Sequence, residues 1–118
     1  QVTAPETQIF RFVRGVSPAS GEEQRLRAYL LNALRDDRMR VIIVGHSGTS
    51  GDATANQQLS EARATFAADI ATDIGIDPAR IDFVGVGGAA PSVRPEGMAE
   101  RAWQAELARV EITIQVRR

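Results

Sequence analysis

Residues 41–44 read Val-Ile-Ile-Val, an unbroken run of β-branched side chains. Such a run predicts a strand that is buried on both faces, as in a sheet covered by helices. The chain has 118 residues, which is enough for one compact domain and too few for two. Because only 5% of the residues are aromatic, the core must be built from Val, Ile, Leu and Ala. The sequence therefore predicts one small domain with a helix-covered sheet.

Strand-like and helix-like segments alternate along the rest of the chain. Apolar spacing predicts strands over 9–13, 41–44, 81–86 and 110–116, and helices over about 20–35, 54–74 and 98–106. We expect residues 1–8 to form an irregular N-terminal tail and residues 9–118 to form a single domain. The order β-α-β-α-β-(α)-β predicts an α/β (α+β) two-layer sandwich, with a mixed four-stranded sheet and the helices on one face.

Local signals set the expected helix ends. Ser20 with Glu23, and Thr54 with Gln57, have the spacing of capping boxes, which predicts where the two longer helices begin. Gly75 is placed to close the second helix in a left-handed conformation. Helical spacing predicts two buried stripes, formed by Leu26, Tyr29, Leu30, Ala33 and Leu34 in the first helix and by Leu59, Ala62, Phe66, Ile70 and Ile74 in the second.

Charge and composition exclude several classes of function. The net charge is −1, which disfavours nucleic-acid binding because that requires a basic face. The absence of cysteine excludes disulfides and thiolate chemistry. No apolar run is long enough to cross a bilayer, so we expect no transmembrane segment in this chain. The chain starts at Gln1 rather than Met, and we expect it to be part of a longer protein.

Two short motifs invite an enzymatic interpretation, and neither is complete. The strand that runs into Gly45-His46-Ser47 is similar to a nucleophile elbow, but Thr49 stands where that motif needs glycine. His46 is the only histidine, so a Ser47 nucleophile would have no separate base. Residues 85–90 match a dinucleotide fingerprint, but prolines follow where a helix should open. We therefore expect no catalytic residue, no metal site and no cofactor.

The polar segment 45–64 is the best candidate for a binding site. Asn56, Ser60 and Arg63 fall at helical spacing, so they share one side of the second helix. We expect Arg63 to lie near the surface, beside the loop that precedes the helix. The free N–H groups at a helix N-terminus also favour anions. These features predict a binding site for a small ligand that carries a carboxylate. A solvated Arg63 that pairs with a carboxylate of the loop explains the same pattern.

The segment also resembles the OmpA-like (OmpA/MotB C-terminal) peptidoglycan-binding domain family. That family has G-H-T-D, a short glycine-containing loop and then N-x-x-L-S-x-x-R-A on a helix. The resemblance covers nearly the whole chain, from about residue 10 to 116. The matching residues, in order, are Gly45, His46, Gly51, Asn56, Leu59, Ser60, Arg63, Ala64, Gly75, Ile76, Arg80, Ile81, Gly85, Gly87, Pro91, Arg109, Val110, Glu111 and Ile112.

The resemblance implies a non-catalytic module that binds peptidoglycan. In the family, an aspartate and an arginine hold the diaminopimelate of the stem peptide: the aspartate meets its amine and the arginine, here Arg63, meets its carboxylate. A zwitterionic group needs one partner of each sign, and charge-assisted hydrogen bonds supply the specificity. The resemblance also implies a periplasmic location in a Gram-negative bacterium, within a protein anchored to the outer or inner membrane, with other envelope proteins as further partners.

The chain departs from the family pattern at the aspartate. Gly48 stands in its place, Ser47 replaces the preceding threonine, and Leu107 replaces an asparagine before the last strand. Loss of one charge-assisted bond predicts roughly tenfold to hundredfold weaker binding. Asp52 lies four residues further on and is a candidate substitute.

The expected ligand-binding residues are Arg63, Asn56, Ser47, Gly48, Asp52 and Arg109. Three functions remain open from the sequence: weakened peptidoglycan binding, binding of another carboxylate ligand, or a structural or protein-interaction role in an envelope complex without peptidoglycan binding.

Overall fold

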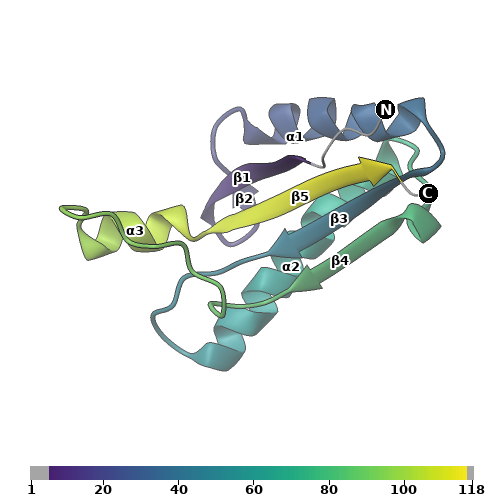
Figure 1. Ribbon diagram of the computed structural model, residues 1–118. Coiled ribbons are helices and arrows are strands. Elements are labelled where there is room, and N and C mark those ends of the chain that lie inside the picture. Colours follow the sequence, from purple (N-terminus) through teal and green to yellow (C-terminus); the bar gives the residue numbers. More distant parts are fainter. Residues whose placement is uncertain (1–5, 117–118) are drawn as a thin grey trace.

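The computed structural model describes residues 6–116 of the chain (Figure 1). The strands are β1 (Glu6–Arg14), β2 (Ser17–Pro18), β3 (Met39–Gly45), β4 (Ile81–Gly85) and β5 (Arg109–Val116). The helices are α1 (Glu22–Leu30), α2 (Ala53–Asp73) and α3 (Glu100–Glu106), and short 3₁₀ helices span Leu31–Arg35 and Pro78–Arg80. Within the described part of the chain, no helix combines the length and apolar character needed to cross a membrane.

The strands form one sheet in the order β2-β1-β5-β3-β4. β3 and β4 are parallel, whereas the other neighbouring strands are antiparallel. This confirms the predicted mixed sheet and two-layer architecture, with five strands instead of four because residues 17–18 add a short edge strand beside β1. β1 begins at Glu6, since residues 6–8 pair with β5. The expectation of an irregular tail is therefore wrong for residues 6–8, and residues 1–5 lie outside the described part.

Helices α1 and α2 cover one face of the sheet, and α3 projects beyond the start of β5 (Figure 1). Alternate side chains of β1, β3 and β5 point into the layer between the sheet and the helices. Their buried members are Phe10, Phe12, Val41, Ile43, Val110 and Ile112. Since side chains alternate along a strand, Ile9, Arg11, Arg109 and Glu111 belong to the opposite face. The covered face of these strands is therefore apolar, while Arg11, Arg109 and Glu111 lie on the opposite face.

Helix α2 lies very close to the ends of β3 and β4. Gly45 and Gly85 are directly paired across these strands. A β-carbon built at Gly45 would lie 2.1 Å from the carbonyl oxygen of Ser60, and one built at Gly85 would lie 2.3 Å from the nitrogen of Glu61. At such short distances a side chain at either position would force the backbone of the helix to move. The paired glycines allow the backbone of the helix to rest directly on the sheet.

This close approach explains why the predicted buried stripe of α2 is partly wrong. The buried residues of the helix are Ser60, Arg63, Ala64, Ala67, Ala68, Ile70 and Ala71. Ala62 is exposed, and Leu59 and Phe66 are only partly buried. A helix seated against backbone accepts small side chains at the contact, so the alanines face inward and the larger residues lie at its margin.

Both predicted capping boxes are also wrong. Helix α1 starts after Gly21, which has a left-handed conformation, and no side chain caps it. The 3₁₀ helix after α1 leaves Leu34 exposed instead of buried. Helix α2 starts after Asp52, whose side chain accepts a hydrogen bond from the N–H of Ala55 at 2.8 Å. The prediction for Gly75 is confirmed, since it has φ of 111° just beyond the end of α2.

Candidate functional site

Two loops meet at the ends of the parallel strands β3 and β4. Ligands of open α/β sheets commonly bind at the carboxyl ends of parallel strands. Here a pocket of about 320 Å³ lies between the loop that follows β3 and the loop that follows β4. Of the predicted site residues, Gly48 and Asn56 line it, and the other lining residues are Thr49, Gly51, Ala53, Gln57, Val86, Gly87, Gly88 and Ala89.

Buried hydrogen bonds hold these loops together. The N–H of Ser47 donates to the carbonyl of Gly87 at 3.0 Å, and its hydroxyl donates to the carbonyl of Gly48 at 2.9 Å. The hydroxyl of Ser60 accepts from the N–H of Gly87 at 2.7 Å. Because Ser47 is buried and its hydroxyl is engaged, it shapes the loop from within and does not offer a free nucleophile.

Asn56 and Asp52 both organise the start of α2. The amide of Asn56 donates to the carbonyl of Ser50 at 2.9 Å. Asp52 caps the helix, and this uses one of its carboxylate oxygens. The predicted loop residues therefore lie together at the helix N-terminus, with their polar atoms directed largely at the backbone of the loop itself.

Arg63 lies deeper than the sequence predicts. Its exposure is 3%, because it sits on the buried face of α2 between the sheet and the turn that joins β1 to β2. Its Nε donates to the carbonyl of Gly15 at 2.7 Å, and its Nη1 donates to the carbonyl of His46 at 2.9 Å. The guanidinium also lies 5.5 Å from the ring centre of Phe12. The expectation that Arg63 lies near the surface is wrong, because the close seating of α2 turns this residue inward.

The buried charge of Arg63 has no anionic partner. Both acceptors of its hydrogen bonds are neutral carbonyls, and among residues 6–116 no carboxylate forms an ion pair with it. Burial alone lowers the pKa of Arg63 below its usual value. Its third nitrogen, Nη2, has no acceptor in the described part of the chain and is not fully buried. An unpaired buried cation is costly, so an anion within reach of Nη2 would be favoured. Arg63 itself is not among the residues that line the pocket between the two loops.

Gly48 is in contact with a residue that the sequence did not point to. A β-carbon built at Gly48 would lie 2.4 Å from Oε1 of Gln104 in α3. That oxygen accepts a hydrogen bond from the N–H of Thr49 at 2.8 Å, and Nε2 of Gln104 donates to the hydroxyl of Thr49 at 2.6 Å. Gln104 therefore fills the space that a larger side chain at position 48 would need. Gln104 lies outside every motif that the sequence analysis singled out.

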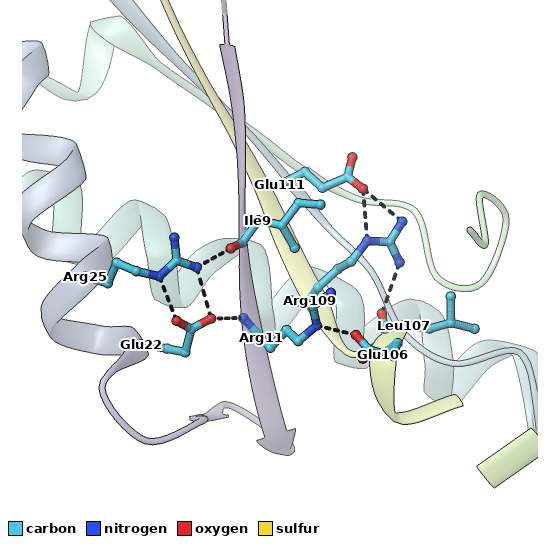
Figure 2. Close-up of polar contacts among 8 residues, drawn as sticks. All are labelled: Ile9, Arg11, Glu22, Arg25, Glu106, Leu107, Arg109 and Glu111. Carbon is cyan, nitrogen blue, oxygen red and sulfur yellow. Dashed lines mark hydrogen bonds and ion pairs between the residues drawn. The ribbon is translucent and has the colours of Figure 1, made fainter. Parts of the chain in front are cut away.

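Arg109 belongs to the other face of the sheet. Figure 2 shows its guanidinium directed at Glu111, at 2.9 Å, and at the carbonyl of Leu107. It lines a second pocket of about 320 Å³ on that face, together with Trp103 and the ion-paired Arg11 of β1. The structure therefore does not bring Arg109 together with the loop residues 47–56. Leu107 is fully buried, so it offers no exposed apolar surface.

His46 is a buried histidine whose charge the fold disfavours. Its Nε2 has no hydrogen-bond partner within residues 6–116, although Oε1 of Glu111 lies 3.4 Å away. Burial is the main cause that lowers its pKa below 6.5, followed by the positive charge of Arg109, while Glu111 acts in the opposite direction. His46 is therefore neutral in the folded protein at neutral pH.

This environment predicts a pH-dependent stability. The unfolded chain takes up a proton on His46 near pH 6.5, whereas the folded chain does so only at lower pH, so the stability falls as the pH decreases through this window. We expect the melting temperature to decrease from pH 7.5 to 5.5. In a His46→Phe variant, position 46 cannot titrate, so the part of the decrease that comes from protonation of His46 should disappear. Equal decreases in both proteins would contradict this assignment.

Comparison with known proteins adds a family match. The model of the OmpA family matches residues 15–103. No curated protein sequence matches the chain. Among solved structures, the chain is similar to the OmpA-like domain of FopA1 from Francisella tularensis, with 18% identity and a TM-score of 0.77, covering 96% of this chain and 73% of that one.

Two further solved structures are similar over most of their length. The peptidoglycan-associated lipoprotein of Burkholderia pseudomallei has 19% identity and a TM-score of 0.79, covering 92% of this chain and 90% of that one. The cell wall anchor of the T6SS from Pseudomonas aeruginosa has 28% identity and a TM-score of 0.72, covering 95% of this chain and 82% of that one. At 18% and 19% identity, the likeness to FopA1 and to the Burkholderia lipoprotein concerns the fold alone. The T6SS cell wall anchor, at 28% identity, is closer in sequence.

Proposed function

Because the chain belongs to the OmpA family, we propose that it is a non-catalytic module that binds peptidoglycan weakly and anchors a bacterial envelope protein in the periplasm. Arg63 is the main ligand contact, and it binds a carboxylate of the diaminopimelate in the stem peptide. Asn56 and the loop from Ser47 to Asp52 shape the site. Arg109 lies on the opposite face of the sheet and has no part in this contact.

The unpaired charge of Arg63 carries this proposal. Two of its nitrogens are fixed by the carbonyls of Gly15 and His46, which hold the guanidinium in one position. The third nitrogen is left for a ligand, and a carboxylate there would both accept a charge-assisted hydrogen bond and compensate the buried cation. Two of the five N–H donors of the guanidinium are already used within the protein, which leaves fewer of them for a ligand. The geometry therefore favours weak binding.

The similarity to the T6SS cell wall anchor supports the same function. This likeness extends over 95% of the chain at 28% identity. A pocket without a nucleophile–base pair is sufficient for an anchor, since holding a ligand requires no bond to be broken. The buried Ser47 hydroxyl and the neutral, buried His46 fit a structural role for both residues.

Sedimentation with purified peptidoglycan tests this proposal. We expect the protein to pellet with peptidoglycan, and free diaminopimelate to release it, because both ligands compete for the same nitrogen of Arg63. Peptidoglycan whose free carboxylates have been amidated is the control and should not retain the protein. The proposal fails if the protein pellets to the same extent with and without peptidoglycan.

One observation favours a second candidate, an interaction module of an envelope complex that has lost peptidoglycan binding. Gln104 fills the space next to Gly48, and its hydrogen bonds with Thr49 close that side of the site. The two candidates differ in one result. Suppose that the wild-type protein does not bind peptidoglycan, but a variant in which Gln104 no longer fills the space beside Gly48 does. The fold has then kept the site, while the natural chain has another role.

A further inference from the structure

We infer that Gln104 takes the place of the missing carboxylate at position 48, and that the natural site therefore does not distinguish a free ammonium from an acylated amine in its ligand. This inference rests on the proposed function. It concerns the chemical form of the ligand, since the amine of diaminopimelate is charged when free and becomes a neutral amide when acylated.

The position of Gln104 is fixed by several contacts. Its carboxamide makes two hydrogen bonds with Thr49, one to the backbone N–H and one to the hydroxyl. Its Oε1 would be 2.4 Å from a β-carbon at position 48. A side chain at this position would have to displace the carboxamide, which is the end of a flexible side chain, and this would disturb its hydrogen bonds with Thr49. The absence of a side chain at Gly48 therefore leaves room for the carboxamide of Gln104.

With the carboxamide of Gln104 in place of a carboxylate at position 48, the site loses one negative charge. A carboxylate attracts an ammonium and rejects a neutral amide, because its own charge would then be left without a partner. The carboxamide of Gln104 is neutral. The acidic residue in contact with it is Glu100, 3.4 Å from Nε2, and its carboxylate is itself paired with Arg94. Arg63 still selects a carboxylate, but the carboxamide beside Gly48 offers the other half of the ligand no negative charge, and Asp52 on the same loop already uses one carboxylate oxygen to cap α2.

A set of four proteins tests this inference: the wild type, Gly48→Asp, Gln104→Ala, and the double variant Gly48→Asp/Gln104→Ala. Each is titrated calorimetrically with a stem tripeptide that ends in diaminopimelate and with the same peptide acetylated on its free amine. Gln24→Ala, an exposed glutamine of α1, is the matched control and should behave as the wild type.

We expect the wild type to bind both peptides with equal affinity. The double variant should prefer the free amine by roughly tenfold to hundredfold, as one added charge-assisted bond predicts. Gly48→Asp alone should gain less than the double variant, because Gln104 still occupies the space. A wild-type preference of tenfold or more for the free amine would overturn the inference.

Urea unfolding of the same four proteins gives a readout that needs no ligand. Gly48→Asp should lower the unfolding midpoint, and Gln104→Ala should reduce that loss, because the clash is relieved. Equal losses with and without Gln104 would overturn the inference.

If the midpoints behave as expected but no variant binds either peptide, Arg63 is not a ligand contact and the proposed function fails together with this account of specificity. If only the double variant binds, and prefers the free amine, Gln104 is confirmed as the obstacle and the wild type is not an anchor.

Discussion

Replacing Gly45 by alanine should lower the free energy of unfolding by about 3 kcal/mol, the upper end of the usual cost of an extra methyl group in a close-packed site. The added carbon would lie 2.1 Å from the carbonyl oxygen of Ser60 and 2.9 Å from the nitrogen of Ala64. Both are backbone atoms of α2, so no side-chain rotation can relieve the clash. The helix must lift away from β3, and the contacts of its buried alanines are then lost.

Chemical denaturation followed by circular dichroism measures this effect. Gly51→Ala is the matched control, because nothing lies within 4 Å of a β-carbon there and only the positive φ of 87° opposes the change. Its cost should be about 1 kcal/mol. If Gly45→Ala is no less stable than Gly51→Ala, the helix is not seated on the sheet as described.

Replacing Arg63 by methionine should abolish peptidoglycan binding and lower the free energy of unfolding by about 2–3 kcal/mol. Hydrogen bonds to charged groups contribute about 1.5–3 kcal/mol each. Arg63 donates two of them, and their loss leaves the carbonyls of Gly15 and His46 without these donors. Removal of a buried, unpaired cation offsets part of this loss, which is why the expected value is below the sum of the two bonds.

Two further variants separate binding from stability. Arg63→Lys keeps the charge but loses the planar fork, so it should retain part of the stability and bind peptidoglycan less well than the wild type. Arg35→Met removes an exposed arginine and should change neither property. Denaturation midpoints and sedimentation with peptidoglycan measure the two effects. A stable Arg63→Met protein that binds normally would exclude Arg63 from the ligand site.

The architecture could be predicted because its signals are local. The run at residues 41–44 gives an inner strand, and the alternation at residues 110–116 gives a strand with one buried face. The expectation that residues 41–44 are buried on both faces is wrong, because Val41 and Ile43 are buried under the helices while Ile42 and Val44 are only partly buried. Gly75 ends α2 as expected, since a left-handed residue there depends only on neighbouring residues. In each case the information needed to form the element is contained within the element.

The details of the site could not be predicted because they depend on tertiary contacts. Helical periodicity gives the spacing of residues on α2, but the close approach at Gly45 and Gly85 decides which side of the helix is buried. That rotation places Arg63 inside rather than at the surface. The contact between Gly48 and Gln104 joins residues that are far apart in the sequence, so no local pattern could indicate it.

The paired glycines beneath α2 also restrict how the molecule can move. At these two strand ends no side chain separates the backbone of the helix from that of the sheet, so a movement of the helix towards the sheet at this point meets backbone atoms directly. We therefore expect α2 to keep its position on the sheet when a ligand binds. Adjustment to an incoming ligand should then take place in the loops after β3 and β4 and in the segment that carries α3. These segments would move relative to a helix that stays in place.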